Sequence, residues 1–468
     1  CLVPAVPDGA GIVYVDSAVA VPGPGRSWGP ALKYLSNATE SAPTNTSIKE
    51  VHIAKGTYYA TGDKSLLYAD SAFVVTRPGL KILGGYSNGG GQLDRNLYPT
   101  ILSGDIGLPA DTSDNTNNVL VIKDVDDGAD SLIIDGLTIT AGKFIFDLNR
   151  IDQLYLAGGV NMNHVFANTV LRNCIITGNY GMICSALYIS GPDAAYIDPS
   201  QIATPQIDHC IFKNNTAFPI PNFPAAYGST CITTMASPRI MNSDFMDNNA
   251  ISGGVLQNLE GTAVFYNCRF LRNSAEIFSA IYNQQDANSI LVNCAILDNV
   301  NSGYKTPPSQ DIADLFNNTI IGNENNSTCS LINTTIANNK NLINPGIHGP
   351  LIVNLTESAS YITNSIIWGN TTNTIYDSLP SNTSKISYSL IQGLASDPAS
   401  HILDGTLNVP VFADTVAGNY HLITASAGID AGFNDSLISK VSAYLPGTTG
   451  SGLDLAGAPR IMDGVIDL

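Results

Sequence analysis

Short runs of alternating apolar and polar residues fill the chain between residues 120 and 430, and turn-forming residues separate them. Alternation with a period of two is typical of β-strands, because successive side chains of a strand point to opposite faces. The 3.6-residue period of amphipathic helices is absent from this stretch. The pattern therefore predicts an almost all-β protein with many short strands.

One block of this pattern recurs seven times, most clearly in "AVFYNCRFLRNSA" (263–275) and "SILVNCAILDNVN" (289–301). Each copy holds a β-branched or aromatic run, a polar pair that is often Asn-Cys, one further residue, a large apolar residue, two residues and a closing Asn. The closing asparagines are Asn179, Asn215, Asn248, Asn273, Asn299, Asn339 and Asn370, at separations of 36, 33, 25, 26, 40 and 31 residues. A second short strand pattern, two small residues followed by alternation, precedes several copies, as in "SGGVLQN" (252–258).

Variable spacing around a constant block distinguishes between repeat architectures. A propeller blade needs about 40 residues and four strands, so the shortest repeats cannot hold one, and the leucine ladder of leucine-rich repeats is missing. In a parallel β-helix each coil adds one strand per face, about 4.8 Å along the axis, and insertions bulge from single turns. We therefore predict an all-β fold: a right-handed parallel β-helix, or solenoid, as a single elongated domain.

Cysteines occupy one shared position of the repeat. They are Cys174, Cys210, Cys268 and Cys294, and Ser or Thr takes their place in the other copies. Equal positions of a solenoid stack, which favours a ladder of small interior side chains. Disulfides between neighbouring coils are an alternative, because a 4.8 Å spacing lies within their Cα range. Metal binding is a weaker alternative, since the chain has no CxxC pair. The closing asparagines suit turns and a ladder of stacked amides.

Composition narrows the partners of the chain. Only 13% of its residues are charged, against roughly 25% in an average soluble protein, and the formal net charge is −18 with a pI near 4.5. An acidic surface argues against nucleic acid and anionic lipid as partners. No run approaches the ~18 apolar residues that a membrane-spanning helix needs.

The chain begins at Cys1, followed by the Pro/Gly-rich stretch "LVPAVPDGAG". A cysteine at a first mature position is typical of a bacterial lipoprotein, which predicts lipidation of Cys1, a tether over residues 1–11, and a membrane contact through this anchor alone. The alternative is that the sequence begins at this cysteine by chance and that Cys1 carries no lipid. We expect an extracytoplasmic protein: an outer-membrane lipoprotein, at the cell surface or facing the periplasm.

The N-terminal part looks like a cap. In "SWGPALKYLSNA" (27–38), Ala31, Leu32, Tyr34 and Leu35 have amphipathic spacing, which predicts a short helix over the open end of the core. We expect a strand and this capping helix in residues 12–49, β-helix coils in 50–432, and a C-terminal capping segment in 433–468.

These motifs resemble known β-helix proteins. "GGV" followed by "FKNN" (212–215), "FMDN" (245–248) and "FLRN" (270–273) resembles the GGA(I/L)…FxxN repeat of polymorphic outer-membrane proteins. The opening "IVYVDSAVAVPGPGRSWGPALKYL" (12–35) and the ending "DLAGAPRIMDGVIDL" (454–468) are similar to a Bacteroidetes-type secreted or surface β-helix family with a choice-of-anchor segment. The resemblance implies a pectin-lyase-like β-helix outside the cytoplasm, and it implies no single activity.

Catalytic motifs are not recognisable. β-Helix lyases need a basic residue that removes the proton α to a carboxylate, and β-helix glycosidases need a close group of aspartates. The sequence shows neither a basic cluster at one repeat position nor a glycosidase signature. Whether the chain is an enzyme is left open; a polysaccharide lyase or hydrolase with a site in a groove is the alternative function, and a passive scaffold is a third.

The stretch "KDVDDGAD" (123–130) brings four carboxylates together: Asp124, Asp126, Asp127 and Asp130. Oxygen ligands of this kind suit calcium. An Asp-Gly turn between strands is the more ordinary interpretation. Calcium is the only cofactor that the sequence suggests.

Long insertions interrupt the repeat at two equivalent corners. Their aromatic and charged residues form a candidate carbohydrate-binding set: Phe144, Phe146, Asp147, Arg150, Asp152, Tyr155, Phe218, Phe223 and Tyr227. Aromatic faces with a few charges suit sugar rings, although the same rings could instead cover the flank of the solenoid. We expect a monomer that binds a polysaccharide or host glycan in the manner of an adhesin.

Overall fold

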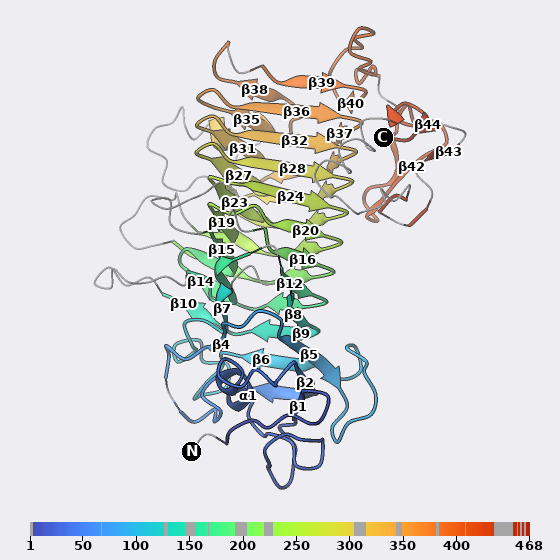
Figure 1. Ribbon diagram of the computed structural model, residues 1–468. Coiled ribbons are helices and arrows are strands. Elements are labelled where there is room, and N and C mark those ends of the chain that lie inside the picture. Colours follow the sequence, from blue (N-terminus) through green and yellow to red (C-terminus); the bar gives the residue numbers. More distant parts are fainter. Residues whose placement is uncertain are drawn as a thin grey trace. The chain divides into compact units, whose positions relative to one another are not determined.

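The computed structural model describes residues 3–66, 68–125, 130–145, 156–166, 168–191, 204–219, 228–303, 315–342, 349–380, 383–407, 409–434, 453–455, 457–458, 461–462 and 465–468. The chain divides into two compact units, residues 1–238 (unit 1) and 239–468 (unit 2). Each unit is a stack of coils whose strands pair in parallel (Figure 1).

Four parallel sheets, A to D, make up unit 1. Sheet A holds β1 (Ile12–Val15), β2 (Glu50–Ala54), β5 (Lys81–Tyr86), β8 (Leu132–Asp135), β12 (Thr169–Arg172) and β16 (Gln206–Asp208). Sheet B holds β3 (Gly56–Tyr58), β6 (Thr100–Ser103), β9 (Leu137–Thr140), β13 (Ile175–Thr177) and β17 (Ile211–Lys213). Sheet C holds β4 (Phe73–Val75), β7 (Leu120–Val125), β11 (Val160–Val165), β15 (Cys184–Ser190) and β19 (Ser229–Thr234), and sheet D holds β10 (Lys143–Phe144), β14 (Tyr180–Gly181) and β18 (Thr216–Ala217).

Unit 2 repeats the same four faces. Its sheet A holds β20 (Arg239–Met241), β24 (Thr262–Tyr266), β28 (Asn288–Val292), β32 (Thr328–Ile332), β36 (Ala359–Thr363) and β39 (Lys385–Ser387). Its sheet B holds β21 (Asp244–Met246), β25 (Arg269–Leu271), β29 (Ala295–Leu297), β33 (Thr335–Ala337), β37 (Ile366–Trp368) and β40 (Leu390–Ile391). Sheet C holds β23 (Leu256–Leu259), β27 (Ile281–Gln284), β31 (Ile321–Glu324), β35 (Ile352–Asn354) and β38 (Ile375–Asp377), and sheet D holds β22 (Asn249–Ser252), β26 (Ser274–Ile277), β30 (Val300–Asn301) and β34 (Lys340–Asn341).

The order of the strands confirms the predicted right-handed parallel β-helix. The chain passes through A, B, D and C and then returns to A one strand further on, so each recurring block is one coil. Register is kept across coils of different length: Val264 pairs with Ile290, 26 residues on, and Ile290 pairs with Ser330, 40 residues on. The additional residues therefore lie in the turns.

Apolar side chains of alternate strand positions fill the coils. In unit 2, Phe245, Phe265 and Phe270 are fully buried, with edge-to-face ring centroids 5.1–6.1 Å apart. Such rings bury a large apolar area and gain further from this geometry. The coils are therefore held by a closely packed interior, as the alternation predicts.

The closing asparagines form the predicted amide ladder. Asn273 Nδ2 donates to Asn299 Oδ1 at 3.0 Å and to the Phe245 carbonyl at 2.9 Å, while the Asn273 backbone N–H also donates to Asn299 Oδ1. The same contacts continue to Asn339 and Asn370. All of these side chains are buried. Their amides satisfy the buried polar groups of the turn between sheets B and D.

A second amide ladder lies inside sheet C of unit 2, and the sequence reasoning did not find it. Asn283 Nδ2 donates to Asn323 Oδ1 at 2.8 Å, and Asn323 Nδ2 donates to Asn354 Oδ1 at 2.7 Å. The ladder ends on Asp377, whose Oδ1 accepts from Asn354 Nδ2 and from Ser384 Oγ. A carboxylate suits this end because it only accepts.

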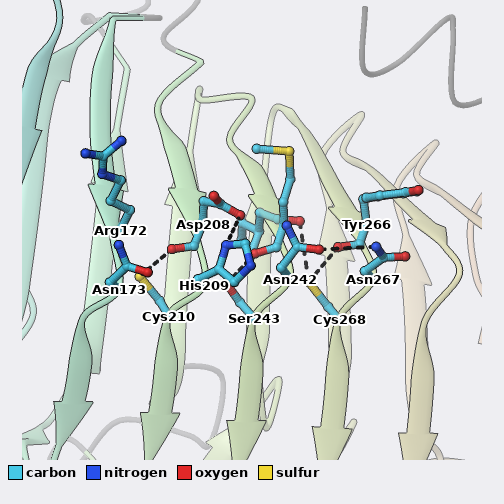
Figure 2. Close-up of polar contacts among 12 residues, drawn as sticks. Arg172, Asn173, Asp208, His209, Cys210, Asn242, Ser243, Tyr266, Asn267 and Cys268 are labelled. Carbon is cyan, nitrogen blue, oxygen red and sulfur yellow. Dashed lines mark hydrogen bonds and ion pairs between the residues drawn. The ribbon is translucent and has the colours of Figure 1, made fainter. Parts of the chain in front are cut away.

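The predicted thiol ladder is also confirmed: every cysteine in the described ranges is a buried free thiol. Figure 2 shows the corner between sheets A and B where Cys210 and Cys268 lie. In unit 2, Cys268 Sγ donates to the carbonyls of Ile240 and Tyr266, both at 3.4 Å. Ser243 Oγ makes the corresponding bond to the Met241 carbonyl at 2.6 Å. The cysteine position of the repeat thus favours a small side chain that donates a hydrogen bond to a nearby backbone carbonyl.

The helix of the N-terminal part begins later than predicted. It is α1 (Leu35–Ser41), with Leu35 and Ala38 buried. The backbone of Leu32 instead bonds to Tyr14 of β1, with N···O at 2.9 Å, because the adjacent Pro30 and Gly29 disfavour a helix there. At the other end, β40 is the last strand among the described residues that belongs to a parallel sheet, well before residue 432. β41 (Phe412–Asp414) and β42 (Asn419–Leu422) pair antiparallel, as do β43 (Ile461–Met462) and β44 (Val465–Ile466).

Candidate functional site

A groove with a cavity volume of about 660 Å³ opens on the outer face of sheet A in unit 2. Five neighbouring strands supply its lining: β24, β28, β32, β36 and β39. The residues are Thr262, Asn288, Ile290, Thr328, Ser330, Ile332, Tyr361, Ile362, Thr363, Lys385 and Ser387. We call this the sheet A groove.

The period-two alternation of the strands places these side chains. Phe265, Leu291 and Leu331 point inward and are fully buried, so their neighbours along each strand point outward. Ile290 and Ile332 form an apolar floor and are only 5% and 3% exposed. Parallel register then aligns the outward residues of successive coils in straight rows.

Polar residues border this floor on both sides. Thr262, Asn288 and Thr328 are register partners at the beginning of their strands, and Thr328 Oγ1 is hydrogen-bonded to Asn288 Oδ1. At the end of the strands, Thr363 Oγ1 and Ser387 Oγ lie 2.8 Å apart. Hydroxyl and amide groups therefore face the groove along both edges.

The groove ends at an aromatic ring and an ammonium group. Tyr361 on β36 is 41% exposed, and its register partner on β39 is Lys385, which is also exposed. Paired positions on neighbouring parallel strands are about 4.8 Å apart and point to the same side. The two side chains therefore present a ring face and a positive charge side by side.

The C-terminal segment closes part of the same face. Ile466, which is fully buried, packs with Val264, Val292 and Ile332 of sheet A. The Ile466 carbonyl accepts from Gly432 N at 2.9 Å, and its N–H donates to Asn434 Oδ1 at 2.9 Å. Val264 and Val292 are thereby covered, whereas Thr262 and Asn288 at the beginning of the same strands still line the groove. Tyr361 on β36 and Lys385 on β39 stay exposed.

The sheet A groove offers groups for hydrogen bonding and for apolar contact. Its lining contains hydroxyls, one carboxamide, a phenol, one ammonium group and apolar side chains, and neither a carboxylate nor an imidazole. General acid–base hydrolysis of a glycosidic bond uses a pair of carboxyl groups. Among the described residues that line the groove, no such pair is present.

A second cavity, of about 480 Å³, lies between sheet B of unit 2 and the C-terminal segment. Two of its polar side chains, Tyr420 and Asp467, are hydrogen-bonded to the protein itself. Tyr420 donates to Asp298 Oδ1 at 3.0 Å, and burial, reinforced by Asp298, raises the pKa of Tyr420. Asp467 Oδ1 accepts from the backbone of Asp430 at 2.7 Å. We interpret these contacts as the docking of the segment on the coils.

Sheet A of unit 1 carries a different surface. The rings of Tyr14, His52 and Tyr86 pack on one another, with His52 and Tyr86 stacked at 4.6 Å. Below them Asp135, which is 1% exposed, accepts from Arg95 and Arg172, both at 2.8 Å. Aromatic faces and charges here contact other protein groups, so this surface offers less to a ligand than the sheet A groove.

The structure describes two of the nine predicted carbohydrate-binding residues. Phe144 lies in β10 and is 3% exposed, so its ring offers little surface to a sugar. Phe218 is half-buried and its N–H donates to the Gly181 carbonyl at 3.0 Å. The other seven lie outside the described residues, namely Phe146, Asp147, Arg150, Asp152, Tyr155, Phe223 and Tyr227.

The candidate calcium cluster is also only partly described. Asp124, at the end of β7, has a positive φ of 51° and an oxygen 3.5 Å from His164 Nδ1. Asp130 is described, but Asp126 and Asp127 lie outside the described residues, as does Cys1. Within the described ranges, no group of three or more His, Cys, Asp or Glu side chains is arranged to hold a metal ion. The calcium site stays a prediction.

The described helix is too short to cross a membrane, and no helix in the described part of the chain has the length and apolarity that a span requires.

Comparison with known proteins identifies the fold. No protein family profile matches the chain, and no curated protein sequence matches it. Among solved structures, pectate lyase Pel9A is similar with a TM-score of 0.51 and 11% identity over 92% of each chain. DFA-IIIase from Arthrobacter chlorophenolicus A6 has a TM-score of 0.41 at 12% identity, covering 85% of this chain and 99% of its own. The GH136 lacto-N-biosidase from Eubacterium ramulus has 0.36 at 11% identity, covering 80% of this chain and 66% of its own.

The strand order and the likeness to Pel9A together define this chain as a right-handed parallel β-helix protein. At 11% identity the likeness concerns the fold alone. What the chain does must be argued from its own groove.

Proposed function

We propose that this chain is an extracytoplasmic, adhesin-like β-helix protein that binds a polysaccharide or host glycan in the sheet A groove. The observation that carries the proposal is the lining of the groove: an apolar floor, polar edges and the exposed ring of Tyr361 at its end.

This lining suits the two kinds of surface on a sugar. The C–H face of a pyranose ring packs on an aromatic ring, and the hydroxyl groups around it exchange hydrogen bonds with Thr, Ser and Asn side chains. The five strands place these groups in a row along the coils, so an extended chain of sugars would meet one set of contacts per coil. The name of the similar solved structure Pel9A, a pectate lyase, is in line with a carbohydrate ligand.

Binding without cleavage is favoured over the alternative of a polysaccharide lyase or glycoside hydrolase. A hydrolase would need two carboxyl groups flanking the scissile bond, and a lyase would need a base beside the acidic α-proton. The described lining of the groove supplies no carboxyl group, and its one basic side chain is Lys385.

A glycan array tests the proposal, with each retained glycan then measured by calorimetry. Tyr361→Ala should weaken binding about tenfold, because loss of one stacking contact removes about 1.4 kcal/mol. Tyr376→Ala is a matched control, since Tyr376 on β38 is 43% exposed but belongs to sheet C. An array without any retained glycan, or equal losses in both variants, would contradict the proposal.

Turnover of the retained glycans separates binding from catalysis. Reducing-sugar and unsaturated-product assays over many hours should stay at the level of the buffer. Product formation that follows the protein concentration would replace the binding proposal with the enzyme alternative.

Anchoring through a lipid on Cys1, a cell-surface position and a monomeric state belong to the same proposal. Incorporation of a labelled fatty acid into the wild-type chain and its loss in Cys1→Ser would support the anchor. Light scattering would give the mass of the protein in solution.

A further inference from the structure

We infer that the sheet A groove selects an anionic glycan, with Lys385 receiving the negatively charged substituent of a sugar that stacks on Tyr361. This inference rests on the proposed function, because it names the class of glycan that the same groove takes.

The first argument is the isolation of the charge. Lys385 is the only charged residue that lines the groove. Among the described residues, no carboxylate oxygen lies within 4.0 Å of its Nζ, and no hydrogen bond ties it to the protein. Two other cations of unit 2 are paired: Arg269 with Asp244 and Arg272 with Asp247. An exposed ammonium group without an acidic partner is therefore available to a ligand.

The nearest acidic residue along the chain is also engaged elsewhere. Asp377 accepts from Asn354 Nδ2 at 2.7 Å and from the Ser384 hydroxyl at 2.8 Å, as the end of the sheet C ladder. Ser384 directly precedes Lys385 in the chain. Asp377 is bound to Ser384, whereas Lys385 faces the groove. Asp377 therefore accepts hydrogen bonds at the end of the amide ladder and forms no ion pair with Lys385.

The second argument is the register. Tyr361 and Lys385 are direct partners of β36 and β39, and both point outward. At a spacing of about 4.8 Å, one sugar can pack its ring on Tyr361 while a carboxylate or sulfate on its rim approaches Lys385. An ammonium group forms a charge-assisted hydrogen bond with such a substituent, which is stronger than a bond between neutral partners.

The third argument comes from the rest of the molecule. A chain with a net charge of −18 repels polyanions at long range. A preference for a charged ligand over its neutral counterpart cannot then arise from the whole surface. It requires a local cation, and the groove contains one.

The test compares polygalacturonate with the same polymer after full methyl esterification, which removes the charge and keeps the ring. A sulfated galactan and its desulfated form are the second pair. Wild-type protein should bind the charged member of at least one pair three- to tenfold more tightly, and the pair shows whether carboxylate or sulfate is preferred. Lys385→Gln should abolish that preference, Lys385→Arg should keep it, and Tyr361→Ala should weaken both members alike.

Lys340→Gln is the matched control, because Lys340 is exposed on β34 in sheet D of the same unit. Equal binding of the charged and neutral members by wild-type protein would overturn the inference while leaving glycan binding intact. A preference that survives Lys385→Gln, or that Lys340→Gln removes, would also overturn it. Loss of binding to every glycan would instead defeat the proposed function itself.

Discussion

Asparagine and cysteine occupy the interior of the coils for different reasons. Asn299 is fully buried and uses both ends of its carboxamide: Oδ1 accepts from Asn273 N and Nδ2, and Nδ2 donates to Asn339 Oδ1 and to the Phe270 carbonyl. Cysteine needs only one weak donor and a small volume, so serine or threonine can replace it, as at Ser243. The repeat therefore keeps asparagine at its closing position, whereas the cysteine position also accepts serine or threonine.

Removal of one ladder amide should be costly. Asn299→Ala removes the acceptor of the Asn273 backbone N–H and the side-chain donor to Asn339 Oδ1 and the Phe270 carbonyl, all of them buried. Unfolding in denaturant should show a loss of about 3 kcal/mol in the free energy of unfolding. Asn96→Ala is the control: Asn96 is exposed, and its carboxamide bonds to no described residue. Equal denaturant concentrations at the midpoint of unfolding for the two variants would refute the structural role of the ladder.

The buried thiols should be chemically silent in the folded protein. Burial raises the pKa of Cys184 and of Cys329 to about 12, so at pH 8 the thiolate fraction is about 1 in 10,000. Iodoacetamide followed by peptide mapping should label neither residue until denaturant is added. Rapid labelling of either peptide in native buffer would show that the thiols are accessible.

The raised pKa of these two thiols also determines whether the stability of the folded protein rises or falls with pH. A pKa that is higher in the folded state than in the unfolded state means that the folded state keeps protons which the unfolded chain releases. The stabilisation is complete below the unfolded pKa of about 8.5 and is lost as pH rises toward 12. Thermal stability should therefore fall from pH 8 to pH 10.

Single strands of this protein have few residues, and pairing with neighbouring coils gives them stability. Their sequence pattern predicted the strands and their inward residues well, because alternation is a local signal. The amphipathic pattern over 27–38 predicted the N-terminal helix too early in the chain, since the helix begins at Leu35. The backbone of Leu32 pairs with β1 instead, and a local sequence pattern does not reveal such a pairing.

The rings that join neighbouring coils should dominate the stability of unit 2. Phe270→Ala removes a fully buried ring that contacts Phe245 and Phe265, which should lower the free energy of unfolding by about 3–5 kcal/mol. Tyr376→Ala removes a half-exposed ring from the same unit and should cost less than about 1 kcal/mol. Chemical denaturation compares the two, and similar losses would contradict the assignment of the core.

At the scale of the whole molecule, the C-terminal segment determines which part of sheet A of unit 2 stays open. Ile466 fills the outer face above β24 and β28, and Leu468 N donates to the Gly428 carbonyl at 3.0 Å. The groove therefore occupies the part of this face that Ile466 leaves open. A function that depends on the groove also depends on the docking of a segment far away in the sequence.

Weakening this contact should release the segment before the coils unfold. Ile466→Ala removes a fully buried side chain and about 3 kcal/mol of docking energy. Amide exchange of residues 465–468 should accelerate strongly, whereas exchange in β28 and β32 should stay slow. Val465→Ala, at a half-buried position, should change little, and unchanged exchange in Ile466→Ala would show that the segment does not depend on this contact.

The sequence by itself determined the β-helix, its coil boundaries, the Asn273–Asn299 ladder and the buried thiols, because in a solenoid equal positions of the repeat stack and local periodicity becomes spatial order. It directed the search for a binding site to the insertions, where most of the candidate residues lie outside the described part of the chain. Only the tertiary structure revealed the sheet A groove. Tyr361 and Lys385 stand at ordinary outward positions of the repeat, and what sets them apart is the register between coils and the C-terminal segment that covers their neighbours.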